Sequence, residues 1–147
     1  MTKVRPARVE EVDRLIHLLG LLFTIEEDFS VDVEKQRNGL RLLVEGDRAC
    51  VLVAEICGQV IGMCTGQLVI STAEGGPSVL VEDVVVVPEH RGQGVGRALM
   101  AVLAEWANNR GATRMQLLAD KNNPPALAFY DRLGWTSTAL ICLRRFI

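Results

Sequence analysis

The chain has 147 residues, of which 49% are hydrophobic and 23% charged, and a formal net charge of −2 at pH 7. This composition excludes a disordered chain, and its length predicts one domain over residues 1–147. The sequence pI of about 5.7 disfavours a nucleic-acid partner, because such domains usually have a pI above ~9. No apolar run reaches the ~18–20 residues that cross a membrane, and the polar start lacks a signal-peptide core. We therefore expect a cytoplasmic protein with no membrane partner.

Cysteine and histidine are too sparse to predict a metal site. The four cysteines form no C-x-x-C pair, and the chain has two histidines. Zinc sites need three or four such ligands at short spacing, and disulfide frameworks belong to oxidising compartments. We expect no metal, and free cysteines that act as small hydrophobic residues.

The first part of the chain predicts a short extended start and two helices. From Glu10, apolar residues recur at the i, i+3, i+4, i+7 spacing of one helical face, and the polar run Glu26-Glu27-Asp28 marks the exit. A second helix is expected over residues 32–45. Its inward-facing residues are expected to be Val33, Leu40, Leu43 and Val44.

The rest of the chain predicts a mixed α/β sheet. Runs 49–56 and 60–71 predict a hairpin with Gly58-Gln59 as its two-residue turn. The later strands are expected at 79–87 and 114–119, with one or two more in 136–147, and helices at 94–110 and 123–133. The order predicts a mixed, mostly antiparallel sheet of six to seven strands with helices on both faces.

The most informative stretch is the turn between the valine-rich strand and the next helix. It holds three glycines at alternate positions, Gly92, Gly94 and Gly96. Glycine permits φ > 0 and exposes backbone N–H groups, and the first amides of a helix are unpaired and carry partial positive charge. Arg91 and Arg97 add formal charge. These features predict a phosphate or pyrophosphate cradle; the alternative is a tight turn whose glycines serve packing alone.

Neither familiar nucleotide loop fits this turn. A P-loop needs a Lys-Ser/Thr pair, and the helix continues as Arg97-Ala98-Leu99. A Rossmann loop needs a third glycine as the sixth residue of its motif, where this chain has Arg97 or Leu99. The Rossmann loop also normally follows the first strand of its domain. An ADP or dinucleotide binder remains the alternative from the nucleotide class.

Residues 91–96, RGQGVG, match [Q/R]-x-x-G-x-[G/A], the coenzyme A pyrophosphate signature of the GNAT N-acetyltransferase superfamily. Residues 123–135 resemble the same family's N-x-x-A-x-x-x-Y-x-x-x-G-F/W element. Both motifs occur in the family's order, and the resemblance covers nearly the whole chain. It implies the GNAT acyl-CoA N-acyltransferase fold and acetyl transfer from acetyl-CoA, the cosubstrate, to an amine. A homodimer is possible, since dimers are common in the family.

The resemblance also implies where the cosubstrate binds. It places the pantetheine arm and the acetyl carbonyl along Val84, Val85 and Val86, in a gap where this strand splays from the next. The pyrophosphate would be held by the amides of Arg91, Gly92, Gln93, Gly94, Val95, Gly96 and Arg97. Asn123 matches an asparagine that contacts the CoA arm in relatives, and it also suits a helix N-cap.

The catalytic candidates are Tyr130, Glu82 and Asp83. Tyr130 is the chain's one tyrosine and matches the family position whose hydroxyl faces the sulfur. With a reference pKa of ~10 it stays protonated and suits a general acid; the alternative is a packing residue. Glu82 and Asp83 resemble the acidic pair of glucosamine-6-phosphate acetyltransferases. We expect their side chains on opposite faces of the strand, and we expect the apolar setting to raise the pKa of a carboxyl group there. Glu82 is favoured over Asp83 as the base. The alternative is that the pair forms an ion pair at the edge of the strand.

Departures from other branches favour a small primary amine as acceptor. The histone-acetylating branch has its glutamate base at the position of Leu80, and the ribosomal-protein branch at the position of Leu118. Glu26-Glu27-Asp28 would border the acceptor site and attract a cationic amine, although such a run also suits an ordinary solvated loop. The alternatives are a non-enzymatic acyl-CoA-binding module and a peptide or protein N-acetyltransferase.

Overall fold

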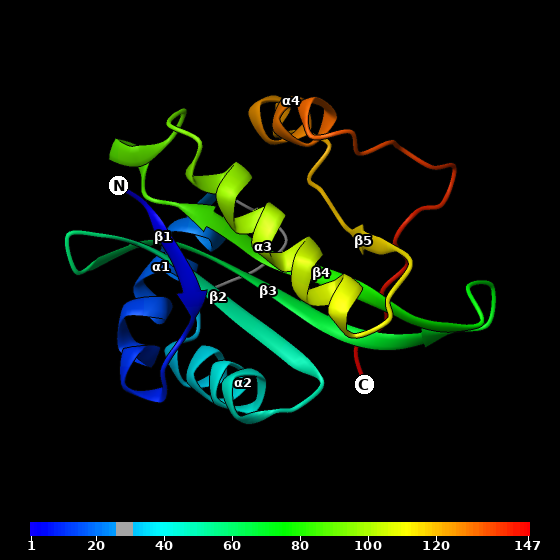
Figure 1. Cartoon of the computed structure of the whole chain (residues 1–147), viewed down its shortest axis with the longest axis horizontal. Coiled ribbons are helices and arrows are strands. Elements are labelled where there is room, and N and C mark those ends of the chain that lie inside the picture. Colours follow the sequence, from blue (N-terminus) through cyan, green and yellow to red (C-terminus); the bar gives the residue numbers. More distant parts are fainter. Residues whose placement is uncertain (26–30) are drawn as a thin grey trace. The chain divides into compact units, whose positions relative to one another are not determined.

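The computed structural model describes residues 1–25 and 31–147, which form two compact units, Met1–Leu117 and Leu118–Ile147. The first unit holds one sheet in the order β1-β2-β3-β4-β5 (Figure 1). Its strands are β1 (Lys3–Pro6), β2 (Ala49–Ile56), β3 (Gln59–Ser71), β4 (Gly76–Val86) and β5 (Met115–Leu117). Neighbouring strands are antiparallel except β4 and β5, which are parallel. The expected mixed sheet is confirmed, but its described strands number five, not six to seven.

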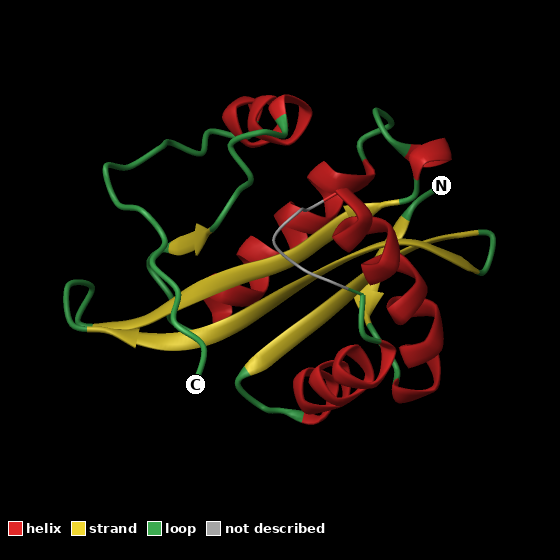
Figure 2. Ribbon diagram, turned by 180° about the vertical axis from the view of Figure 1, so that it is seen from behind, coloured by secondary structure: helices red, strands yellow, loops and turns green. Residues whose placement is uncertain are grey.

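Helices cover both faces of this sheet. Figures 1 and 2 show α3 (Val95–Asn109) on one face, and α1 (Val12–Ile25) and α2 (Val33–Glu45) on the other. The α3 face fits closely because β3 carries Gly66, where a Cβ would lie 2.8 Å from Leu103 Cδ1. Leu103 is fully buried there. No helix in the described part of the chain is long and apolar enough to cross a membrane.

The two N-terminal helices follow the predicted periodicity with one difference in α2. A 3₁₀ turn, η1 (Val9–Glu11), leads into α1, and the Asp32 side chain caps α2 by accepting from the N–H of Lys35. Leu40 is buried as expected, but Val33 is 43% exposed. Gln36 is buried in its place, at 7% exposure. Val33 is the first residue of α2, and the end of the helix is open to solvent there. The buried face of α2 therefore begins one turn after the predicted position.

The β2–β3 turn differs from the prediction by one residue. The two residues between the strands are Cys57 and Gly58, with φ of +49° and +78°. Positive φ at both central positions is the pattern of a type I′ turn, whose twist matches that of the flanking strands. Glycine is therefore the second turn residue, not the first, and Cys57 is exposed rather than part of an apolar strand.

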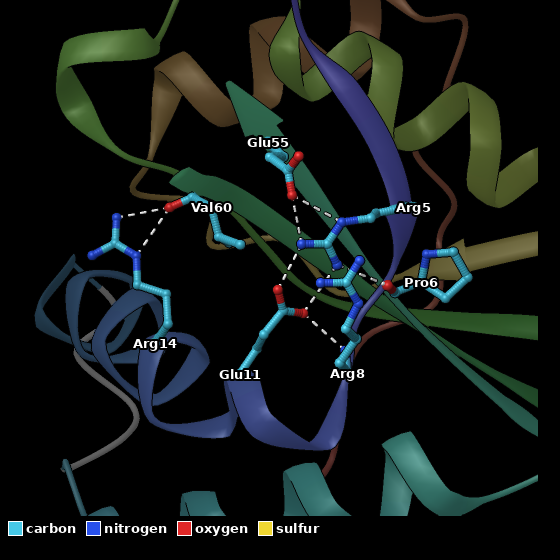
Figure 3. A network of polar contacts seen from close by, with 7 residues as sticks. All are labelled: Arg5, Pro6, Arg8, Glu11, Arg14, Glu55 and Val60. Carbon is cyan, nitrogen blue, oxygen red and sulfur yellow. Dashed lines mark hydrogen bonds and ion pairs between the residues drawn. The ribbon is translucent and has the colours of Figure 1, made fainter. Parts of the chain in front are cut away.

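Arg5 ties the start of the chain to the sheet. Figure 3 shows its guanidinium between two carboxylates, with Nη2 2.6 Å from Glu11 Oε1 and 2.6 Å from Glu55 Oε2. Glu11 also accepts from the backbone N–H of Arg8 at 2.8 Å. Arg14 of α1 donates to the Val60 carbonyl at the start of β3. These bonds join β1, η1, α1 and the β2–β3 hairpin.

The second unit consists of α4 (Pro124–Arg132) and the segments around it. The helix begins after Asn123, whose Oδ1 accepts from the N–H of Ala126 at 3.4 Å, and it ends near Gly134, with φ of +87°. The closing strands expected in 136–147 are absent from this part of the described chain. Aliphatic content alone does not make a strand, because strand preference depends on a partner edge and on burial. Leu140, Ile141, Leu143 and Phe146 are 80% to 86% exposed.

Candidate active site

The acidic pair of β4 lies at a β-bulge. Thr65 of β3 pairs with Glu82 and Met63 pairs with Val85, so β4 has one more residue than β3 between these two pairs. Asp83 lies at this point with φ of +55°. That left-handed conformation costs most residues free energy and is tolerated by Gly, Asn and Asp. The bulge breaks the regular alternation on which the expectation of opposite faces rested.

Thr65 holds both residues of the pair. Its Oγ1 lies 3.1 Å from the carbonyl oxygen of Glu82 and 3.3 Å from Asp83 Oδ2. Thr65 is 1% exposed, and Asp83 is half-buried. Because cross-strand partners share a face, the Asp83 carboxylate reaches the same side as Thr65 and Glu82. The expectation of opposite faces is therefore wrong.

Glu82 does not lie in the apolar setting that we expected. Its side chain is exposed, although it stands between strand residues that are mostly buried. The burial that the expectation assumed is therefore lacking at Glu82. Of the two carboxylates, Asp83 is the one held by a hydrogen bond from the sheet.

Beyond Val81, β4 has one neighbouring strand in the first unit. Its pairing with β5 covers the three residues from Val79 to Val81 and ends at Leu117. Its pairing with β3 continues to Val86. Among the described residues of Met1–Leu117, the outer edge of β4 therefore lacks a strand along Val84, Val85 and Val86, where the resemblance implies that a pantetheine arm would lie.

One backbone group on this edge is bonded to the turn that follows. Val87 donates its N–H to Ile61 on β3, so the N–H and C=O of Val86 point away from β3. The Val86 carbonyl accepts a hydrogen bond from Arg91 Nε at 2.8 Å. Arg91 thus links the open edge of β4 to the predicted cradle.

The N-terminus of α3 presents unpaired amides. Gly94 is its N-cap residue, no side chain caps it, and its first turn has no acidic residue. The N–H of Ala98 donates to the carbonyl of Gly94 at 3.0 Å. The N–H groups of Val95, Gly96 and Arg97 precede that bond and have no partner within the helix. The N–H of Arg91, in contrast, donates to the Pro88 carbonyl in the 3₁₀ turn η2 (Pro88–His90).

The glycines of the turn are not required for packing. A Cβ on Gly92 or Gly94 would meet no atom within 4 Å, and their φ values are +72° and +85°. Packing contacts therefore do not explain glycine at these two positions, whereas the positive φ of a tight turn does. Open space, unpaired amides and the positive end of a 15-residue helix fit an anion such as a pyrophosphate. Arg97 is exposed in the first turn of α3.

The other two site candidates, Asn123 and Tyr130, lie in the second unit. Asn123 is the N-cap of α4, as one of its two predicted roles requires. Tyr130 is half-buried, with its ring centroid 5.1 Å from that of Phe129 and 5.8 Å from that of Trp135. Their contacts with a cosubstrate stay predictions. The acidic run Glu26-Glu27-Asp28 lies outside the described residues.

The two buried cysteines, Cys50 and Cys64, are unsuited to act as nucleophiles. All four are free, and burial raises the pKa of Cys50 to about 11 and raises that of Cys64 as well. The charge of Asp83 contributes to the shift at Cys64. Among the described residues, no three His, Cys, Asp or Glu side chains form a group that could hold a metal ion.

Comparison with known families bears directly on this site. The model of the acetyltransferase (GNAT) family matches residues 13–135. The chain belongs to the GNAT acetyltransferase family. The match includes the β4 bulge, the glycine turn and α4.

Two named relatives illustrate the range of the family. Thialysine N-epsilon-acetyltransferase of Mus musculus is 29% identical over 143 residues, which is 90% of this chain and 83% of that protein. Streptothricin acetyltransferase of Streptomyces lavendulae is 35% identical over 79 residues, which is 54% of this chain. The matched part spans 42% of the streptothricin enzyme and 28% of the uncharacterized N-acetyltransferase YobR of Bacillus subtilis (strain 168).

Solved structures confirm the GNAT acetyltransferase fold. The aminoglycoside N-acetyltransferase AAC(6')-Iy in complex with CoA has a TM-score of 0.86 at 18% identity, covering 99% of this chain and 95% of that one. At this identity the likeness shows the fold alone. Thr65 is not predicted by the sequence, because neither of the two motifs includes it. Its one signal is a hydroxyl residue inside the predicted strand 60–71.

Proposed function

We propose that the chain is one N-acetyltransferase domain that transfers the acetyl group of acetyl-CoA directly to a primary amine of a small molecule, within a ternary complex. The observation that carries this proposal is the uncapped N-terminus of α3 beside the open edge of β4, in a chain of the GNAT family. Backbone amides there would bind the pyrophosphate, and Arg97 would add charge. The bound thioester would supply an activated acetyl group.

The chain's own residues would supply orientation and proton transfer. Backbone groups of Val84, Val85 and Val86 would align the thioester, and orientation alone can supply ~7–11 kcal/mol of a barrier. A carboxylate of the β4 bulge, Glu82 or Asp83, would accept a proton from the amine. Tyr130 would donate a proton to the departing sulfur, for which its phenol is suited by a reference pKa of ~10.

Small amines are favoured by the acceptors that the relatives' names state. Streptothricin, thialysine and aminoglycosides all carry amines and are all small molecules. An amine of this kind carries a positive charge before it reacts, so the exposed Glu82 would attract it. A carboxylate must then take a proton from the ammonium group before the nitrogen can attack the thioester.

The test is release of CoA thiol from acetyl-CoA in the presence of a panel of small amines. We expect at least one amine to support release, and Tyr130→Phe to lower kcat about a hundredfold, as loss of a general acid does. Glu82→Gln and Asp83→Asn are compared to identify the base: the variant that loses activity lacks it. Glu105→Gln, which removes an exposed carboxylate from α3, is the control and should leave kcat unchanged.

Two other outcomes would redirect the proposal. If acetyl-CoA raises the melting temperature but no amine, peptide or protein yields CoA, the chain is an acyl-CoA-binding module. If NAD(H) or ATP stabilises the protein and CoA does not, the turn binds nucleotides of another class and acetyl transfer is refuted.

A further inference from the structure

We propose that Thr65 is a positioning residue for proton transfer at Asp83, with a single hydroxyl that serves both the charged and the neutral form of that carboxyl group. This inference rests on the proposed function. It assigns a role to a buried residue of β3 that no sequence motif includes. It also makes Asp83, rather than the exposed Glu82, the base that the fold holds in place.

The geometry gives the Thr65 hydroxyl two acceptors. Oγ1 lies 3.3 Å from Asp83 Oδ2 and 3.1 Å from the Glu82 carbonyl oxygen. A threonine hydroxyl has one proton to donate and lone pairs that accept. It therefore donates to one of these oxygens at a time, and at 1% exposure Thr65 is shielded from water that could replace either bond.

The bond between Thr65 and Asp83 can then be made in each protonation state of the carboxyl group. When Asp83 is charged, the hydroxyl donates to Oδ2. When Asp83 has accepted the amine proton and carries it on Oδ2, it donates to Oγ1, and the threonine hydroxyl turns to the Glu82 carbonyl. Only hydrogens move, so proton uptake keeps the buried Thr65 hydroxyl bonded to Asp83, and loss of that bond would cost free energy.

The bulge explains why the position is built this way. The left-handed φ of +55° at Asp83 places its side chain on the Thr65 side of the sheet. Thr65 also bonds the carbonyl of Glu82, the residue just before the distortion. One hydroxyl thus lies within hydrogen-bond distance of both the backbone of the bulge and the carboxylate.

Two titratable groups near Asp83 are Glu82 on β4, which is exposed, and the buried thiol of Cys64 on β3. The helices packed on the two faces of this part of the sheet bury apolar side chains, among them Leu15 and Leu18 of α1 and Leu99 and Leu103 of α3.

The kinetic test uses Thr65→Val, which keeps the shape and removes the hydroxyl, and Thr65→Ser, which restores it. We expect Thr65→Val to lower kcat about tenfold to a hundredfold, as loss of a hydrogen bond to a charged group does, with little change in KM for acetyl-CoA. The acid limb of the kcat/KM profile should move to higher pH, because the bond to the charged carboxylate is stronger than the bond to the neutral form, and its loss disfavours the charged form more. Thr65→Ser should recover most of the activity. If Thr65→Val keeps the wild-type kcat and pH profile, the role is refuted.

A double-mutant cycle separates positioning from simple stability. In an Asp83→Asn background, Thr65→Val should lower kcat much less than in the wild type, because there is no base left to position. Asparagine tolerates the left-handed conformation, so the backbone of the bulge is preserved. An equal loss in both backgrounds would show that Thr65 acts on the fold and not through Asp83.

A readout without catalysis keeps this inference separate from the proposed function. The carboxyl carbon of Asp83, assigned by its loss in Asp83→Asn, can be titrated by NMR in the wild type and in Thr65→Val. We expect the variant to titrate at higher pH by about one unit. An unchanged titration refutes the role of Thr65 whether or not any amine is acetylated, whereas a wild type that acetylates no amine refutes the proposed function alone.

Discussion

Gly94→Ala tests the cradle with a single methyl group. Gly94 has φ of +85°, and a Cβ there would meet no atom within 4 Å. The cost to folding is therefore conformational alone, about 1–2 kcal/mol for an L-residue in the left-handed region. For a chain of this length that corresponds to a decrease in Tm of roughly 2–8 °C, at ~2–4 °C per kcal/mol.

The same methyl group would stand where a bound pyrophosphate approaches the amides. We expect a loss of about one hydrogen bond to a charged group, and so a Kd for CoA at least tenfold weaker. At a CoA concentration of 100 times the wild-type Kd, the wild type gains about 2.7 kcal/mol of stability. The variant should then gain only about 1.4 kcal/mol, which is measured as the change in Tm on adding CoA.

Gly111→Ala is the matched control at the other end of the same helix. Gly111 has φ of +82° and likewise no atom within 4 Å of a Cβ. Both substitutions should therefore lower Tm without CoA by similar amounts, but Gly111→Ala should keep the full gain with CoA. If the two variants lose the same part of that gain, the turn at 91–97 does not bind the pyrophosphate and the reasoning is refuted.

Three further predictions concern stability, measured by urea unfolding. Hydrogen bonds from Arg5 lower the pKa of Glu11 in the folded protein. The Glu11 carboxylate therefore adds to the free energy of unfolding above its unfolded pKa of ~4.3, and this contribution is lost as the pH falls through its lower pKa in the folded protein. Glu11→Gln should therefore lower stability at pH 7 and flatten its decline towards pH 3; an unchanged slope would contradict this. Cys57→Asn should raise stability by up to about 1 kcal/mol, since asparagine suits positive φ, whereas a decrease would show that the thiol has a packing role. Gln36 is buried, and neither polar atom of its side chain has a partner among the described residues, so Gln36→Met should raise stability by about 1 kcal/mol; a loss would reveal a bond to Gln36.

Local signals predicted helices well. The ends of α3 and α4 agree with the sequence because their signals are near neighbours: Gly94 and Gly111 flank α3, and Asn123 caps α4. The same locality explains the glycine turn, whose positive φ values follow from residue type. Helix ends and turns are decided within a few residues, so a pattern can show them.

The bulge and Thr65 could not be predicted in that way. A bulge depends on the register between β3 and β4, and the run of four valines after Asp83 looks like an uninterrupted strand. Once the register is known, Thr65 appears opposite the distortion. The hairpin turn was misplaced for a smaller reason, since Gly58 suits either position of a two-residue turn and the conformation of Cys57 decides between them.

The closing strands were over-predicted from composition. Residues 136–147 contain several aliphatic side chains, yet the described segment has no strand and Leu143 is 86% exposed. Whether such a run pairs depends on an available edge elsewhere in the molecule. Sequence alone carries no information about that edge.

The left-handed backbone at Asp83 also restricts how this position can evolve. Only Gly, Asn and Asp occupy such a conformation at low cost, so drift among related enzymes should be confined largely to these three residues whatever the chemistry. Invariance of a short polar residue at this position in a family alignment would then reflect the steric restriction of the left-handed backbone conformation. Selection for acid–base chemistry would be visible only as an excess of Asp over Asn, together with a hydroxyl residue retained at position 65.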